Sequence, residues 1–363
     1  MNKNRNILIC PLEWGLGHAG RMIPLARKLQ ERNYNVIIGS GKTHQALFRN
    51  ELPGLKYIDF PGFNPGYSRF LPQYISLLLK TPLLLYHIVA EHIRLKRIIN
   101  ENKIDIIVSD NRFGLWSRRI KSVYVTHQIV IPFPRNFRFL EWTGILYHRF
   151  FIRKYSFCFI PDLPGDINLS GRLAHGIRLP ENTRYIGLLS RFTGRSQSVK
   201  SRFRFPHNTV ILSGPEPQRG ILRQKLIGIL NKREPPSVFL EGKPGDSVEI
   251  TKSGNITSYN HLPAGEMQDM IKGSTVVVAR SGYTSVMELI SLNSCALLIP
   301  TPGQPEQEYL AEYLSRKGWF STISQNRLNE SAILTAGKAQ WPSYLIDEIN
   351  ELLEKALDEL LNK

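Results

Sequence analysis

The sequence predicts an α/β protein with two doubly wound domains, each a mostly parallel sheet between layers of helices. Short apolar runs alternate with longer amphipathic segments along the chain, which is the pattern of repeated β–α units. Many of the apolar runs are continuous Val, Ile and Leu, as expected of strands buried on both faces of a parallel sheet. The chain has 363 residues. Since a domain usually holds about 100–200 residues, we expect two domains.

Strands are expected in both halves of the chain. Those of the first half lie at residues 7–10, 35–39, 56–60, 105–109, 123–126 and 157–160. Those of the second half lie at residues 209–212, 237–240, 256–259, 275–279 and 295–299. Amphipathic helical patterns separate them, for example at residues 22–31 and 285–292. This order of elements favours two Rossmann-like domains.

A stretch without clear periodicity, residues 187–207, separates the two halves and is rich in Ser, Arg and Gly. We therefore expect an N-terminal Rossmann-like domain at residues 1–187 and a C-terminal one at residues 188–342. The tail at residues 343–363 has the apolar spacing of a single amphipathic helix.

The charge is distributed unevenly between the halves. The formal net charge is +17, from 47 Lys and Arg against 30 Asp and Glu. Residues 1–184 hold 27 basic and 12 acidic residues, whereas residues 185–363 hold 20 and 18. A basic N-terminal half attracts phosphate-rich surfaces such as nucleic acid, anionic lipid or a lipid-linked diphosphate. The alternative is that a basic surface only aids solubility.

A nucleic-acid-binding protein is the non-enzymatic alternative that this charge suggests. The sequence has no helix-turn-helix, RNP or zinc signature, and its basic residues are not gathered into one tract. We therefore expect no nucleic acid partner.

Cysteine usage and hydropathy bear on the compartment. The three cysteines, Cys10, Cys158 and Cys295, are far apart in apolar stretches and form no CxxC pair, so a zinc ribbon or a disulfide framework is not expected. No signal peptide is visible. The apolar segment at residues 70–90 is interrupted by Lys80 and Pro82, which makes it a poor membrane span. These features indicate a cytoplasmic protein.

The first candidate site is the turn Trp-Gly-Leu-Gly-His-Ala-Gly-Arg at residues 14–21, which follows the first expected strand. Gly15 and Gly17 let the backbone turn tightly and let a ligand approach it. The amides at the start of the next helix favour anions. His18 would project from the carboxyl edge of the sheet, where open α/β sheets bind ligands. The alternative is that His18 only caps the helix.

A second motif, Gly-Ser-Gly-Lys-Thr at residues 39–43, imitates a phosphate-binding P-loop. A P-loop needs another glycine five residues before its second one, and that position is Val36. We interpret the motif as an ordinary strand–helix turn.

The third candidate site spans residues 275–307. A buried strand ends in Ala-Arg-Ser-Gly at residues 279–282, and a helix begins directly afterwards. Free amides and hydroxyls at such a helix start suit a diphosphate. Glu288 can accept two hydroxyl hydrogen bonds, as from a ribose, and its apolar neighbours argue against a solvated helix-face charge. The residues of this candidate site are Arg280, Ser281, Gly282, Thr284, Ser285, Glu288, Glu306 and Gln307.

These residues carry a family resemblance. Residues 279–282, Glu288 and Glu306-Gln307 resemble the donor-site signature of glycosyltransferase family 28, and the turn at residues 15–21 is similar to the N-terminal loop of MurG-like enzymes. The resemblance implies a GT-B fold, in which two Rossmann-like domains face a cleft. It also implies a UDP-sugar donor on the C-terminal domain, an acceptor on the N-terminal domain, and inversion without a metal or cofactor. The tail helix would cross back onto the N-terminal domain.

The resemblance also assigns residue roles. Glu288 would hold the donor ribose, and Glu306 with Gln307 would hold the donor sugar. The strand end at residues 124–128 resembles the acceptor side of MurG. The residues implied beside the base are Tyr259, His261 and Leu262, and the acceptor-side candidates are His127 and Gln128. The family's second glycine-rich loop is replaced by residues 213–219, with one glycine and two prolines, so Arg219 or Arg280 is expected to supply charge to the diphosphate.

The expected reaction is displacement of UDP from a sugar C1 by an acceptor hydroxyl. His18 is the first choice as general base, because an ordinary imidazole pKa suits the task. Asp110, at the end of the strand 105–109, would orient His18 or compete as the base, and Glu13 is a third candidate. The alternative enzyme is a UDP-sugar 2-epimerase of the same fold.

The segments 70–90 and 142–159 combine Leu, Phe, Tyr and Trp with Lys and Arg. Such segments can lie on an anionic leaflet, which favours a cell-envelope enzyme that is peripheral on the inner face of the cytoplasmic membrane. The expected function is therefore transfer of a hexose or N-acetylhexosamine to a membrane-associated or lipid-linked acceptor. The alternative is that both are core helices whose charges reach outward.

Overall fold

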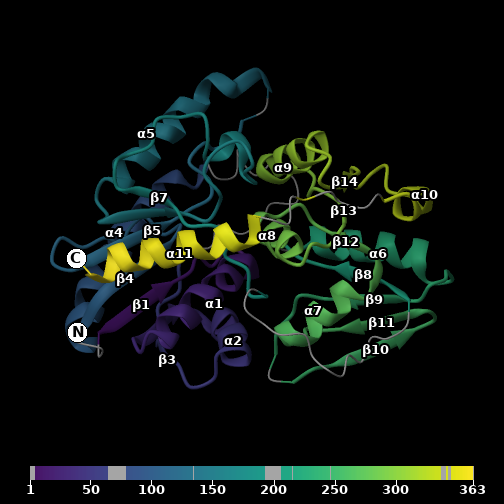
Figure 1. Cartoon of the computed structure of the whole chain (residues 1–363), viewed down its shortest axis with the longest axis horizontal. Helices are drawn as coiled ribbons and strands as arrows, with labels where there is room; N and C mark the ends of the chain where they lie inside the picture. Colours follow the sequence, from purple (N-terminus) through teal and green to yellow (C-terminus); the bar gives the residue numbers. More distant parts are fainter. Residues whose placement is uncertain are drawn as a thin grey trace. The chain divides into compact units, whose positions relative to one another are not determined.

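The computed structural model describes residues 5–63, 79–133, 135–192, 206–214, 216–245, 247–336, 341 and 345–362. The chain forms two compact units (Figure 1). The first comprises residues 1–14, 18–189 and 344–363, and the second comprises residues 15–17 and 190–343. The main division falls after Leu189, two residues beyond the boundary expected from the sequence.

The first unit contains, within the described ranges, a seven-stranded parallel sheet in the order β3-β2-β1-β4-β5-β6-β7. Its strands are β1 (Asn6–Cys10), β2 (Asn35–Ser40), β3 (Lys56–Asp59), β4 (Ile104–Asp110), β5 (Lys121–Val125), β6 (Phe157–Ile160) and β7 (Thr183–Tyr185). This is the doubly wound order, and it reverses between β1 and β4. Ligands of open α/β sheets bind at the carboxyl ends of the strands that flank such a reversal.

Helices cover both faces of this sheet. They are α1 (Leu16–Glu31), α2 (Lys42–Glu51), α4 (Thr81–Asn102), α5 (Glu141–Ile152) and α11 (Leu345–Asn362), with 3-10 turns η1 (Arg135–Leu140) and η2 (Gly171–Leu173). α4 buries Leu95 and Ile98 in one apolar cluster with Leu8 of β1. α5 buries Ile152 in another with Tyr124 of β5. Each such side chain stabilises the unit by about 1.5–3 kcal/mol on burial.

α11, yellow in Figure 1, packs on the first unit, the unit on which the family resemblance placed it. Its buried residues follow the spacing of one helix face and are Leu353, Ala356, Leu357, Leu360 and Leu361. Glu354 pairs with Lys28 of α1 at 2.8 Å and also with Arg32, which directly follows α1. Glu359 pairs with Arg184 of β7 at 2.8 Å. The last helix is therefore an integral layer of the first unit.

The second unit also contains, in the part of the chain that is described, a seven-stranded sheet, in the order β10-β11-β9-β8-β12-β13-β14. Its strands are β8 (His207–Ile211), β9 (Ser237–Leu240), β10 (Ile250–Ser253), β11 (Ile256–Tyr259), β12 (Ser274–Ala279), β13 (Leu297–Leu298) and β14 (Ser321–Thr322). β10 runs antiparallel at the edge, and the other strands are parallel. The helices are α6 (Gln218–Leu230), α7 (Ala264–Lys272), α8 (Tyr283–Ser291), α9 (Pro305–Arg316) and α10 (Glu330–Leu334).

The two doubly wound sheets confirm the predicted fold class. Every strand expected from the sequence is present, although the strand expected at residues 295–299 shortens to Leu297–Leu298. β2 ends at Ser40 and α2 begins at Lys42, so the P-loop-like motif is an ordinary strand–helix turn, as predicted. None of the described helices is both long and apolar enough to cross a membrane. Part of the apolar segment at residues 70–90, namely residues 70–78, lies outside the described residues.

Candidate active site

His18 and Arg21 lie in the first turns of α1, directly after β1. The chain enters α1 through Gly15, whose φ of +93° is a conformation that glycine adopts without strain. Residues three apart on a helix lie on the same face, so His18 and Arg21 point together toward the carboxyl end of the neighbouring strand β4. Asp110 is the last residue of that strand.

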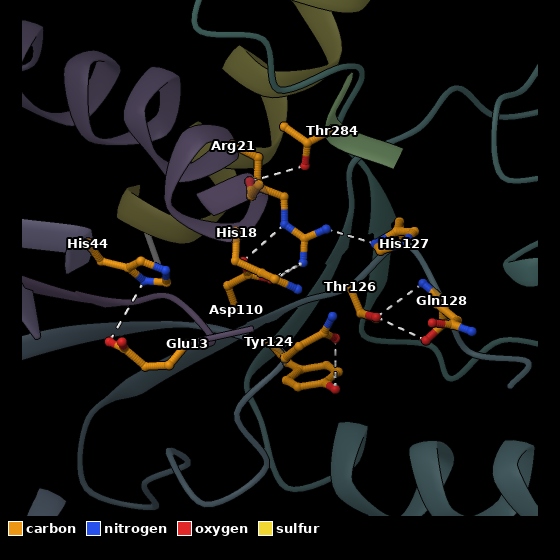
Figure 2. Close-up of polar contacts among 12 residues, drawn as sticks. Glu13, His18, Arg21, His44, Asp110, Tyr124, Thr126, His127, Gln128 and Thr284 are labelled. Carbon is orange, nitrogen blue, oxygen red and sulfur yellow. Dashed lines mark hydrogen bonds and ion pairs between the residues drawn. The ribbon is translucent and has the colours of Figure 1, made fainter. Parts of the chain in front are cut away.

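Asp110 is the anchor of a compact polar cluster (Figure 2). His18 Nδ1 lies 2.9 Å from Asp110 Oδ2. Arg21 donates from Nε to Asp110 Oδ2 at 3.0 Å and from Nη2 to Asp110 Oδ1. Asp110 and Arg21 are 0% and 1% exposed, whereas His18 is 15% exposed. The structure thus places Asp110 in contact with His18, and its role in orienting the base stays a prediction.

The charge states of the cluster follow from its contacts. Burial alone would raise the pKa of Asp110, but Arg21 and His18 lower it to about 2. Burial lowers the pKa of His18 below its ordinary value; the Asp110 carboxylate opposes this shift, and the Arg21 cation adds to it. At neutral pH the cluster therefore holds an ionised Asp110 and a neutral His18. A neutral imidazole is the form in which histidine acts as a general base.

His127 joins the same cluster from the segment after β5. Its Nδ1 lies 2.7 Å from Arg21 Nη1, and the residue is 4% exposed. Gln128 lies beside it, and its backbone N–H donates to Thr126 Oγ1 at 3.1 Å. The structure therefore brings His127 to the polar cluster, whereas the described hydrogen bonds of Gln128 are those of its backbone.

Glu13, the third candidate base, is held elsewhere. Its Oε1 accepts a hydrogen bond from the N–H of Gly41 at 2.6 Å, and it lies 3.7 Å from His44 Nδ1. Gly41 is the N-cap of α2, where the helix dipole stabilises a carboxylate. The structure thus corrects this expectation, because Glu13 anchors the start of α2 and is not part of the His18 cluster.

In the second unit, Arg280 and Ser281 follow β12 as expected, but Arg280 faces inward. Its guanidinium donates to the carbonyls of Pro300 and Gln218 at 3.2 and 2.8 Å and to Gln325 Oε1 at 2.7 Å, and the residue is 0% exposed. Burial lowers the pKa of Arg280 to about 10. The expectation that Arg280 supplies charge to a diphosphate is wrong, since its guanidinium is buried and donates to two backbone segments and to one side-chain amide. Ser281 is also buried and donates from Oγ to the Gln307 carbonyl at 2.8 Å.

The N-terminus of α8 has the features of an anion site. The N-cap residue is Gly282, which has no side chain that could accept a hydrogen bond from the amides of the first turn. Thr284 and Ser285 lie in that turn, which holds no acidic residue. The first amides of a helix have no partner within the helix, and together with the helix dipole they favour an anion. This geometry suits the diphosphate expected at Thr284 and Ser285.

Glu288 is a buried ion-pair partner, which rules out the alternative of a solvated helix-face charge. It is 6% exposed, its Oε1 lies 2.7 Å from Arg191 Nε, and its Oε2 lies 3.3 Å from Arg191 Nη2. Sequence reasoning missed Arg191, because it lies in the stretch without periodicity. Any ligand hydroxyl that binds Glu288 must share this carboxylate with Arg191.

Glu306 and Gln307 begin α9, and both follow the loop after β13. Gln307 is 7% exposed, and its Oε1 accepts from the N–H of Thr301 at 2.9 Å. Its side-chain nitrogen, Nε2, lies 4.0 Å from the position that a Cβ atom on Gly282 would occupy, at the start of α8. The structure therefore places Gln307 beside the candidate anion site.

The other expected donor-site residues lie at the carboxyl edge of the second sheet. Tyr259 ends β11, His261 and Leu262 follow it, and Leu262 is buried at 6% exposure. Arg219 pairs with Glu216 at 2.9 Å and donates to the Gly242 carbonyl at 3.2 Å. The Glu216 carboxylate offsets the charge that Arg219 was expected to offer.

Two doubly wound units with these strand orders define the GT-B architecture of glycosyltransferases, and solved structures of that class share it. The glycosyltransferase SnogD from Streptomyces nogalater matches with a TM-score of 0.62 over 99% of both chains at 12% identity. MurG from Acinetobacter baumannii matches with a TM-score of 0.50 over 99% of this chain and 95% of that chain, also at 12% identity. At such identities the likeness concerns the fold.

Residues 246–340 match the glycosyltransferase family 28 C-terminal domain. A MurG-type N-acetylglucosamine transferase of Sulfurihydrogenibium sp. is 24% identical over 158 residues, which are 43% of this chain and 39% of that protein. One from Bacillus thuringiensis is 34% identical over 74 residues, which are 20% of this chain and 21% of that protein. The chain therefore spans about two fifths or less of the length of these relatives. These matches confirm the resemblance to MurG-like GT-B glycosyltransferases.

Proposed function

We propose that this protein is an inverting glycosyltransferase that moves a hexose or N-acetylhexosamine from a UDP-sugar to a hydroxyl of a membrane-associated or lipid-linked acceptor. The observation that carries the proposal is the match of residues 246–340 to the family 28 C-terminal domain, because that region contains α8 with its open N-terminus and Glu288. The relative from Sulfurihydrogenibium is named for transfer of N-acetylglucosamine to a pyrophosphoryl-undecaprenol acceptor, which supports the choice of donor and acceptor class.

In the proposed donor site, the first amides of α8 hold the diphosphate, and Glu288 accepts hydrogen bonds from the ribose. Gln307 lies beside the same helix start, where its amide group can donate to the transferred sugar. Arg191 pairs with the Glu288 carboxylate and orients it before the ribose arrives. The sequence contains no D-x-D carboxylate clamp, which supports stabilisation of the leaving group by helix amides and not by a metal ion.

The proposed chemistry is a single displacement. His18 removes the proton from the acceptor hydroxyl while that oxygen forms a bond to C1 of the sugar. The bond between C1 and the diphosphate oxygen breaks, and UDP leaves with the electron pair. Attack from the face opposite the leaving group inverts the anomeric centre. Asp110 orients His18 and stabilises the imidazolium that forms, at the 2.9 Å contact with Nδ1.

The membrane part of the proposal rests on the outer faces of α4 and of η1–α5 in the first unit. α4 exposes an apolar stripe that includes Leu83, Tyr86 and Ile93, with exposed fractions of 48–68%. α5 exposes Trp142 and Phe150 at 59% and 58%. These exposed positions support the membrane interpretation, because core helices would bury such side chains.

Ring contacts through Trp116 join the two helices into one surface. Trp116 stacks on His92 of α4 with ring centroids 4.2 Å apart. Lys154, just after α5, lies 4.7 Å from the Trp116 ring and 4.5 Å from the Phe150 ring. We call this the α4–α5 surface.

The charge of the α4–α5 surface suits anionic lipid. Between residues 81 and 100 the only acidic residue is Glu91, which is buried and pairs with Arg112 at 3.1 Å. Between residues 135 and 152 the only one is Glu141, which pairs with Arg172 at 2.6 Å. Basic residues with exposed apolar neighbours and paired acids are the features of helices that lie on an anionic membrane.

Vesicle flotation tests the membrane part. We expect the protein to float with vesicles that contain anionic phosphatidylglycerol and not with purely zwitterionic vesicles. The double variant Trp142→Ser/Phe150→Ser should lose most of this association. The control Leu334→Ser changes a side chain that is 65% exposed on α10 of the second unit, and it should float like the unaltered protein. Equal flotation of the double variant would contradict the proposal.

A donor screen tests the enzymatic part. Calorimetric or thermal-shift titration with UDP-, GDP- and dTDP-sugars should show binding of a UDP-sugar, since a ligand of the native state raises the melting temperature. UDP release should then require a hydroxyl acceptor, such as a glycolipid or a polyprenyl-diphosphate sugar in detergent. Conversion of the UDP-sugar to an epimer without an acceptor would support the epimerase instead. Absence of binding to every sugar nucleotide would contradict both.

A further inference from the structure

The guanidinium of Arg21 lies between two histidines and one carboxylate, as Figure 2 shows. Its Nε and Nη2 donate to the two oxygens of Asp110, and its Nη1 lies 2.7 Å from His127 Nδ1. Arginine can only donate hydrogen bonds, so His127 Nδ1 is the acceptor of that contact. A neutral His127 therefore carries its ring proton on Nε2.

His18 is in the opposite situation. Its Nδ1 lies 2.9 Å from Asp110 Oδ2, and an ionised carboxylate can only accept. Nδ1 of His18 therefore carries the ring proton, and Nε2 is bare. Nη2 of Arg21 also lies 2.9 Å from this Nδ1, but an atom that donates to Asp110 cannot accept from Arg21. The guanidinium meanwhile donates to Asp110 and His127, and it acts on His18 through its charge.

We infer that Arg21 is a positioning residue that holds the Asp110 carboxylate and His127 Nδ1 as acceptors, so that Asp110 leaves His18 with a bare Nε2 while His127 presents a protonated one. The catalytic meaning of this arrangement rests on the proposed function, in which the bare nitrogen takes the proton of the acceptor hydroxyl. The arrangement itself is a property of the folded first unit. It explains why a cation is buried at 1% exposure next to the candidate base.

Burial and the Arg21 cation together keep His18 neutral by lowering its pKa. The charged and titratable groups that face His18 are Arg21 on α1, Asp110 on β4 and His127 after β5. Asp110 favours the imidazolium, whereas Arg21 disfavours it. Removal of the Arg21 charge leaves the effect of Asp110 unopposed by that cation. A variant without the cation should therefore hold a protonated His18 at a higher pH.

The inference is tested by nitrogen NMR of the whole chain with ¹⁵N-labelled histidine, in the absence of substrate. The nine histidines can be assigned by single replacements. At neutral pH we expect the Nδ1–H tautomer for His18 and the Nε2–H tautomer for His127. In Arg21→Met, His127 should populate both tautomers, and the pKa of His18 should rise because the Arg21 cation no longer opposes Asp110.

Activity gives a second readout that a purely structural role would not move. In Arg21→Met, the fall of turnover on the acidic side of the pH–rate profile should move to higher pH together with the pKa of His18. Part of the turnover lost at neutral pH should therefore return at alkaline pH. Arg21→Lys keeps the charge and should restore much of the ordinary profile. The control Arg112→Met removes another buried arginine of the first unit, which pairs with Glu91, and should leave the pH of this fall unchanged.

The outcomes separate this inference from the proposed function. A His127 protonated on Nδ1 in the unaltered protein would overturn the inference, and so would an unchanged pKa of His18 in Arg21→Met. If Arg21→Met does not fold, the inference is tested by the tautomers of the unaltered protein and by the His18 pKa in Arg21→Lys. That pKa should stay close to the one in the unaltered protein, because lysine keeps the positive charge. The expected NMR pattern in a protein that transfers no sugar would overturn the proposed function alone.

Discussion

Replacing Asp110 by Asn should destabilise the first unit strongly at neutral pH. The carboxylate is 0% exposed and is the ionic partner of Arg21, which is 1% exposed. Removing one member of a buried ion pair leaves the other charge buried without compensation, which costs about 3–5 kcal/mol. We therefore expect Asp110→Asn to lower the free energy of unfolding by that amount at pH 7.

The pH dependence of this loss can be worked from the pKa of Asp110. In the folded protein the pKa is lowered from 3.8 to about 2, so the carboxylate contributes roughly 2 kcal/mol of stability. A carboxylate with a depressed folded pKa contributes above its unfolded pKa and loses that contribution as the pH falls through the folded pKa. The difference between the two proteins should thus shrink by roughly 2 kcal/mol between about pH 5 and pH 2.

The assay is urea denaturation followed by circular dichroism at several pH values, for the unaltered protein, Asp110→Asn and a control. Other carboxylates titrate in both proteins, so their effects cancel in the difference. The control Asp105→Asn lies on the same strand, where an exposed Asp105 accepts from the N–H of Asn6 at 2.7 Å, and should cost less than about 1 kcal/mol. A loss in Asp110→Asn no larger than in this control, or a loss that does not change with pH, would refute the reasoning.

Three further predictions follow from the same contacts. His18→Ala should lower turnover by ~10²–10⁴-fold if His18 is the base, with donor affinity unchanged, and near-normal turnover in a transfer assay would remove it from that role. Glu288→Gln should weaken UDP binding about tenfold or more in calorimetry, because a charge-assisted contact is worth about 1.5–3 kcal/mol; the control Glu312→Gln, on an exposed side chain of α9, should bind normally. Leu357→Ala empties a fully buried site on α11 and should cost about 2–5 kcal/mol in denaturation of the first unit, and a cost below 1 kcal/mol would show that α11 packs loosely.

The central strands could be predicted from the sequence because both faces of each strand are buried, which produces continuous apolar runs. The edge strands β7, β10 and β14 could not, since they are short and at least partly exposed. Ile250–Ser253, for example, is exposed throughout and gains its place by pairing with β11. Its side chains therefore do not form the continuous apolar run from which the central strands could be predicted.

The candidate site could be predicted only in part, for a related reason. His18 and Asp110 were identifiable because each follows an apolar strand, and the carboxyl ends of such strands meet at one edge. The role of Arg21 depends on β1, β4 and β5 lying side by side, which no local pattern reveals. Arg280 was misassigned because a motif gives a residue type and not the direction in which the side chain points.

The first unit is built from both ends of the chain, with the second unit inserted between them. Near the termini, Arg5 donates to the carbonyl of Leu361 at 3.2 Å. A ribosome therefore releases the whole second unit before the last layer of the first unit exists. Until α11 has emerged, the surface of the first unit that it will cover, which includes Arg32 and Arg184, is accessible to solvent and to chaperones. Loss of the buried residues Leu357, Leu360 and Leu361 would thus damage the unit whose synthesis begins first.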